Sequence, residues 1–206
     1  MNLTQSVHYL RSKPLFYLLS LLTGGFAIWW WLTPPLAILA AAFSVLLVAL
    51  SLIDAKHYIL PNRLVVLLAV LGIAFTAMES TFLPPTLEWP AFIGARIVTA
   101  LLVMAFMLGI GWLGKMISKR EAMGMGDVKM VGAITLWVDL DGLLLTLLIA
   151  SLLALPWALY SITKRLLKHR KQSTNFIPFG PYLAIGAWIS FMFRGIIWAF
   201  MIAAGV

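Results

Sequence analysis

Two aspartates that lie far apart in the chain, Asp54 and Asp127, have the residue type and setting for acid–base chemistry. Asp54 ends an apolar run in "SLIDAKHYILPNRL", and Asp127 begins another in "GMGDVKM". When two carboxyl groups lie close together, like-charge repulsion keeps both from ionising, and they share a proton. The ionised group can then take a proton from water while the protonated group gives one to a carbonyl oxygen or a leaving amine. Such a pair could hydrolyse a peptide bond without a metal or a nucleophilic side chain.

The composition of the chain indicates a membrane protein. The 206 residues are 63% hydrophobic and 11% charged, whereas a soluble domain carries about 25% charged residues. We therefore expect an all-α, polytopic transmembrane helix bundle that forms one integral membrane domain over residues 1–206. The fifth of its seven segments is too short to cross the hydrocarbon core and must tilt, thin the bilayer or be sheltered inside the bundle. The seven apolar segments are 14–32, 35–53, 64–80, 91–114, 128–138, 142–162 and 181–204.

The basic residues predict the orientation of these segments. All but two of the 15 Lys and Arg residues fall on one side of a seven-segment arrangement, and the loops on the other side carry acidic residues instead. The positive-inside rule makes the basic side cytoplasmic, so the N-terminus is expected in the cytoplasm. Asp54 and Asp127 then lie at the same, cytoplasmic face. The acidic residues of the opposite side are Glu79, Glu88, Asp139 and Asp141.

Two arginines fall within apolar segments. Arg96 lies near the outer start of the fourth segment, from which it can extend outward to water. Arg194 lies deep in the seventh segment, where an unpaired charge is costly, so it should extend to the interface or form a structural ion pair.

The residues around the two aspartates suit a substrate loop, although each also has a structural interpretation. Gly124 and Gly126 free the backbone for positive φ and for close approach of a peptide, or they simply form a turn or a helix contact. Asp127 lies at the positive end of a helix dipole, and it could equally be a helix N-cap. Lys129 either steers an acidic substrate or anchors the cytoplasmic end of its helix.

The loop after Asp54 is expected to be structured. Pro61 cannot continue a helix, and Asn62 can cap the next one. His57 is expected to be a surface residue rather than a metal ligand, because no second histidine occurs nearby. The chain has no cysteine, which excludes thiolate metal sites, and we expect no metal and no cofactor.

Three segments of the sequence resemble the type IV prepilin peptidase family. "GMGDVKM" is similar to the GxGD signature of intramembrane aspartic proteases, in the form with a following x-K. "DAKHYILPNRL" is similar to the family's other aspartate segment, and "FIPFGPYLAIGAW", residues 176–188, to its late proline-glycine segment. The third segment adds three site candidates, and the resemblance covers residues 50–206. These three candidates are Pro178, Gly180 and Pro181.

The resemblance implies a membrane aspartic endopeptidase in which Asp54 and Asp127 are the catalytic pair. Such enzymes lie in the bacterial inner membrane as multi-pass proteins, with the active site facing the cytoplasm. They cut the positively charged leader from type IV prepilins or from pseudopilins of type II secretion systems, just before the hydrophobic helix of the substrate. The implied partners are these precursors and the lipid bilayer, and no nucleic acid.

One departure concerns a second activity of the family. Many members also methylate the new N-terminus and carry a cytoplasmic insert, often with paired CxxC motifs, between the first segments. Here that connection is only about "TPP", so methyltransferase activity is not expected, and the chain looks more like the short, peptidase-only members.

Two other classes of function are compatible with the same carboxylates. A proton- or cation-coupled transporter would use them as an ion relay, but the sequence lacks paired repeats, and the acids lie at the membrane rim. A structural assembly factor for a secretion system would not need them at all.

Overall fold

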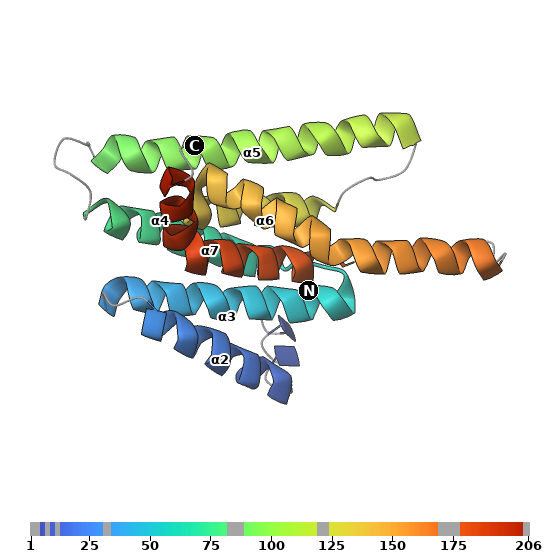
Figure 1. Cartoon of the computed structure of the whole chain (residues 1–206), viewed down its shortest axis with the longest axis horizontal. Coiled ribbons are helices and arrows are strands. Elements are labelled where there is room, and N and C mark those ends of the chain that lie inside the picture. Colours follow the sequence, from blue (N-terminus) through green and yellow to red (C-terminus); the bar gives the residue numbers. More distant parts are fainter. Residues whose placement is uncertain are drawn as a thin grey trace.

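The structure is a computed structural model that describes residues 5–6, 9–10, 13–30, 34–81, 89–118, 124–168 and 178–203. The long elements in these ranges are all helices, and they pack into the elongated bundle of Figure 1. The all-α expectation is therefore confirmed. The helices are α2 (Pro14–Trp30), α3 (Pro34–His57), α4 (Asn62–Ser80), α5 (Trp89–Ser118), α6 (Met125–Lys168) and α7 (Gly180–Ala203).

The apolar lengths of these helices suit a bilayer. Among the described residues, four helical stretches are long and apolar enough to cross a membrane, and the apolar part of α2 is shorter. These stretches are Pro35–His57, Asn62–Ser80, Pro90–Ile117 and Met125–Ser161. The helices support a membrane protein, while the count of seven segments and the cytoplasmic N-terminus stay predictions.

Helix α6 is divided into two arms by Asp139. This residue has φ 65° and ψ −178°, a conformation outside the helical range. In Figure 1 the yellow first arm runs in one direction along the bundle, and the orange second arm runs back beside it. The two arms correspond to the apolar segments expected at 128–138 and 142–162. Residues 130–138 are all buried, so the short arm is sheltered inside the bundle.

An aromatic cluster packs around the end of the first arm. The ring of Trp137 stacks on Phe43 at a centroid distance of 4.6 Å and on Phe75 at 5.2 Å, and Phe191 meets it edge-on at 5.7 Å. These rings come from α3, α4, α6 and α7. The Trp137 Nε1–H donates to the Leu68 carbonyl at 2.9 Å, which satisfies the one polar atom of a fully buried side chain.

The hydroxyl of Thr76 compensates for the break in α6. Leu136 lies in the last turn before Asp139, where backbone carbonyls lose their intrahelical donors. The Thr76 Oγ1–H donates to the Leu136 carbonyl at 2.9 Å, from α4 across to α6. The close approach of these helices depends on Gly72, because a Cβ there would lie 2.8 Å from the Trp137 Nε1 and 2.9 Å from the Leu136 Cβ.

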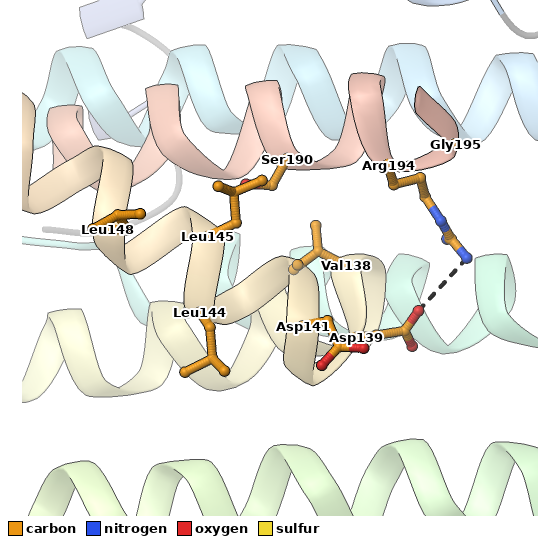
Figure 2. Close-up of a pocket in the computed structure, with 10 residues that line it drawn as sticks. Val138, Asp139, Asp141, Leu144, Leu145, Leu148, Ser190, Arg194 and Gly195 are labelled. Carbon is orange, nitrogen blue, oxygen red and sulfur yellow. Dashed lines mark ion pairs between the residues drawn. The ribbon is translucent and has the colours of Figure 1, made fainter. Parts of the chain in front are cut away.

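Both intramembrane arginines belong to one cluster of ion pairs at the Asp139 break. Arg194 Nη2 lies 2.6 Å from Glu79 Oε1 and 3.5 Å from Asp139 Oδ2, the pair dashed in Figure 2. Arg96 Nη2 lies 3.1 Å from Glu79 Oε2, and its Nη1 also pairs with Asp139. Two cations and two anions from α4, α5, α6 and α7 thus neutralise one another.

The cluster shows which of the two expected settings, extension to water or a structural ion pair, each arginine has. Arg96 is only 8% exposed and does not extend outward to water as expected, because two acidic partners lie within the bundle. Arg194 forms the structural ion pair that its depth predicted. Beside it, between the second arm of α6 and α7, lies a cavity of about 830 Å³ with largely apolar walls (Figure 2).

We expect Gly72→Ala to destabilise the bundle, whereas Gly109→Ala should not. Both glycines lie within helices, so both variants gain helix propensity of about 1 kcal/mol. Only the Gly72 variant forces a Cβ against Trp137, and such overpacking costs about 1–3 kcal/mol. A Cβ at Gly109 meets nothing within 4 Å. Thermal unfolding in detergent, with the two variants side by side, measures the difference, and equal midpoints would contradict the packing described.

Arg96→Met should cost roughly 3–5 kcal/mol, because it leaves two carboxylates sharing one buried cation. Combining it with Asp139→Asn should recover part of that loss, since one of the two anions is removed as well and asparagine tolerates the φ of 65° at this position. Asp141→Asn is the matched control: Asp141 is exposed and lies two residues beyond the break. Denaturation in mixed micelles would detect all three effects, and full additivity of the double variant would argue against the cluster.

Candidate active site

Asp54 lies in the last turn of α3 and is held there by α7. Its side chain accepts a hydrogen bond at Oδ2 from the Gly180 N–H at 3.0 Å, and the residue is only 5% exposed. Helix α3 ends soon after, because Tyr58 adopts a left-handed backbone with φ 53° while its N–H still donates to the Asp54 carbonyl at 2.9 Å. The carboxylate is therefore fixed by both its own helix end and the start of another helix.

Asp127 lies in the first turn of α6, at the same end of the bundle as Asp54. Its N–H donates to the Gly124 carbonyl at 3.1 Å, so Gly124, not Asp127, occupies the cap position. The residue is half-buried, and its carboxylate is near enough to Asp54 for electrostatic repulsion between the two. The structure thus places within electrostatic range of each other two acids that are separated by 73 positions in the chain.

Three glycines allow the helix ends to meet around the carboxylates. A Cβ at Gly180 would lie 2.6 Å from Asp54 Oδ2, and one at Gly124 would lie 3.1 Å from Asp127 Oδ2. At Gly126, a Cβ would lie 3.1 Å from the Cβ of Leu60, in the loop that follows α3. A side chain at Gly180 would displace Asp54 or the start of α7. A side chain at Gly126 would press on the loop after α3, and one at Gly124 would press on the Asp127 carboxylate within the same turn.

The expected reason for Gly124 and Gly126 was partly wrong. Neither glycine has a φ in the positive range that other residues rarely adopt. Their missing side chains instead make room for Asp127 and Leu60, within the chain itself.

The expectation that Asn62 caps α4 is also wrong. The N-cap is Pro61, whose carbonyl accepts from the Leu64 N–H at 3.0 Å and the Val65 N–H at 3.2 Å. Pro61 suits this position because its φ of −65° is fixed and it has no N–H to satisfy. Asn62 is the first residue of α4, and its Oδ1 accepts a hydrogen bond from Lys129 Nζ at 3.0 Å.

This hydrogen bond links two site candidates that the sequence had treated separately. Lys129 lies two residues after Asp127 on α6, and Asn62 begins α4. The contact joins the two helix ends beside the carboxylates. It also gives the lysine a partner on the protein itself.

The proline-glycine segment reaches the site through Gly180. Pro181 lies in the first turn of α7, where a missing N–H leaves no intrahelical bond unmade. Pro178 precedes the helix and is half-buried. The two prolines shape the entry into α7, and the backbone of Gly180 makes the contact with Asp54.

Sequence reasoning missed two neighbours of the site. Leu60 packs against Gly126, a contact for which a lone leucine in a loop gives no signal. His57 is half-buried rather than on the surface, and its ring meets Tyr9 edge-on at 5.0 Å. Among the residues that the structure describes, no group of three or more His, Asp or Glu side chains is arranged to hold a metal ion.

Comparisons with known proteins bear on this site. Residues 40–159 match the model of the type IV leader peptidase family, a range that includes Asp54 and Asp127 but ends before Gly180. The chain is 36% identical over 152 residues to a prepilin leader peptidase/N-methyltransferase of Xanthomonas campestris pv. campestris. That match covers 74% of this chain and 48% of the relative.

Two further relatives carry the same name. One, from Aeromonas salmonicida, is 33% identical over 78% of this chain and 51% of its own length. The other, from Pseudomonas aeruginosa, is 31% identical over 88% of this chain and 58% of its own length. The chain thus spans about half the length of the curated relatives it matches. No solved structure matches it. Because the family model covers more than half of its residues, the chain belongs to the type IV leader peptidase family.

Proposed function

We propose that the protein is a membrane aspartic endopeptidase that removes the leader peptide from type IV prepilins or pseudopilin-like precursors. The observation that supports this proposal is the placement of two carboxylates, Asp54 at the end of α3 and Asp127 at the start of α6, within range of electrostatic repulsion. Membership of the family supports the substrate class.

The proposed chemistry is direct attack of water on the scissile carbonyl carbon. One carboxylate of the pair takes a proton from the attacking water, and the protonated partner gives its proton to the carbonyl oxygen. Collapse of the tetrahedral intermediate breaks the C–N bond, and a proton passes to the leaving nitrogen. The products are a leader with a new carboxylate and a mature chain with a new amine.

The surrounding residues are proposed to position this pair and the substrate loop. Gly124, Gly126 and Gly180 allow the helix ends to close around the carboxylates. Pro61 and Asn62 fix the start of α4, and the Asn62 side chain holds Lys129 at the rim. Pro178 and Pro181 set the entry into α7.

The proposed setting is the cytoplasmic face of a bacterial inner membrane. Basic residues gather at the end of the bundle that carries the carboxylates, which supports this orientation. The single membrane domain over residues 1–206, with its peptidase core over 50–206, is part of the same proposal. So is peptidase activity without methylation, on the ground of the absent cysteines.

Asp54→Asn and Asp127→Asn should each lower the rate of prepilin cleavage by about 10²–10⁴-fold, because each removes one member of the acid–base pair. Asp141→Asn, which changes a carboxylate at the other end of the bundle, should leave the rate of cleavage unchanged. Coexpression with a panel of type IV prepilins, read by gel shift and by the mass of the mature N-terminus, measures cleavage and methylation together. Full processing by either aspartate variant would refute the proposed mechanism.

Gly180→Ala should slow cleavage while Gly195→Ala, on the same helix, should not. The Cβ of the first variant would lie 2.6 Å from Asp54 Oδ2, so the carboxyl group must turn or α7 must move. Misplacement of a catalytic group on this scale costs roughly 10- to 100-fold in rate. A Cβ at Gly195 meets nothing within 4 Å. Because Gly180→Ala keeps both aspartates, unchanged stability together with reduced kcat would identify a positioning effect, and equal rates for the two variants would refute it.

A further inference from the structure

An open cavity lies beside the candidate site, between α4, α5 and the first arm of α6. It has a volume of about 520 Å³ and apolar walls, apart from one polar edge formed by Asn62 and Lys129. Lys129 follows Asp127 by two residues, so this edge lies at the same end of α6 as the Asp127 carboxylate, while the two side chains leave opposite sides of the helix. Along α4 the cavity extends from Asn62 to Ile73, which at 1.5 Å per residue is about 16 Å, or three helical turns.

The inner wall of this groove consists of small residues, against which another helix can pack closely. Ala69, Ala100, Gly132 and Ala133 line it, one or two from each of the three helices. Small residues of this kind let the backbones of membrane helices pack closely. Gly132 also gives room to Met104 of α5, whose side chain would collide with any Cβ at that position. The outer walls carry exposed apolar side chains, with Val66 at 60% and Leu101 at 59%.

We propose that this groove receives the apolar helix of the substrate, the segment that follows the cleaved bond. The inference rests on the proposed function and names where that enzyme holds its substrate. Apolar walls offer no partners to backbone N–H and C=O groups, so a segment lying between them must satisfy these groups itself, as a helix does.

The polar edge is where the substrate helix begins. The first N–H groups of a helix have no intrahelical acceptors. At the Asn62–Lys129 edge the Asn62 Oδ1 can accept a hydrogen bond from one of them, and the chain can become extended there. An extended segment that leaves the edge and turns around Gly126 at the start of α6 comes to Asp127, so the groove brings the bond before the helix to the acid pair.

Cysteine crosslinking tests the groove, and the absence of native cysteines makes each introduced thiol unique. Val66→Cys and Leu101→Cys place a thiol on each wall. Val70→Cys and Leu102→Cys are matched controls on the same two helices, since they are similarly exposed at 55% and 65% but do not line the groove. Each variant would be coexpressed with prepilins that carry one cysteine in the first three turns of the apolar helix, and oxidised in membranes.

We expect disulfide-linked enzyme–prepilin adducts from the Val66 and Leu101 variants at least about tenfold more abundant than from the two controls. Val66→Trp, which narrows the groove, should raise the KM for full prepilin by about tenfold, the size of a steric clash in a packed interface, and should leave kcat within about twofold. Val70→Trp should change neither value. Unfolding curves of both tryptophan variants show whether a loss of activity comes from the fold.

The outcomes separate the groove from the peptidase itself. Cleavage by the wild-type chain with equal adducts at groove and control positions, or with none, overturns the groove and leaves the proposed function intact. Adducts confined to the groove without cleavage of any prepilin support the groove and contradict the proposed function. Failure of both cleavage and adduct formation overturns both. A groove that excludes the prepilin because lipid fills it would show as cleavage with no adducts, which overturns the groove.

Discussion

The hydrogen bond from the Gly180 N–H to the Asp54 carboxylate is the contact on which the arrangement at this end of the bundle depends. It joins the last turn of α3 to the first residue of α7, 126 positions later in the chain. The distance of 3.0 Å is open only to a residue without a side chain, because a Cβ at Gly180 would lie 2.6 Å from the acceptor. In a bilayer, apolar burial gives little preference for one helix neighbour over another, so close packing and polar contacts of this kind decide which helix ends meet.

The other carboxylate is positioned by the first arm of α6, which is fixed at both ends. At one end Gly124 and Gly126 allow contact with Asp127 and Leu60. At the other end the ion pairs of Asp139 with Arg96 and Arg194 hold the break, about 18 Å away at 1.5 Å per residue. Between them the arm is buried, and the Trp137 ring packs against aromatic side chains of other helices. The ion-pair cluster therefore acts on the candidate site through a rigid helix and not through contact with it.

The sequence predicted the features that follow from one-dimensional patterns, and it failed where contacts between distant segments decide. Apolar runs predicted the helices, and the alternation of basic loops placed Asp54 and Asp127 at one end, where the structure has them. The φ of Gly124 and Gly126 was wrongly predicted, because the motif alone does not say whether a glycine serves its backbone angles or its missing side chain. Asn62 was wrongly assigned as a cap, because its real partner, Lys129, lies 67 positions away. The outward path of Arg96 was wrong for the same reason: its acidic partners come from two other helices.

If the chain acts as proposed, a carboxylate pair at a membrane face constrains how a membrane-embedded substrate can reach it. An apolar helix loses too much favourable burial if it crosses water, so it must enter from the bilayer, between helices. Hydrogen bonds from Gly180 to Asp54 and from Trp188 to Ser44 hold α7 to α3, and the ring cluster at Trp137 also joins helices of the bundle. On the α5 side, the ion pairs of Arg96 hold the helix at the far end, while Met104 meets Gly132 through an adaptable thioether chain nearer the carboxylates. Because α5 is held by ion pairs at one end and packs through a flexible side chain nearer the other, it can move sideways there at a small cost in free energy. On the proposed function, the substrate helix is therefore expected to enter beside α5, where the proposed groove begins at the end of α6 that carries Asp127.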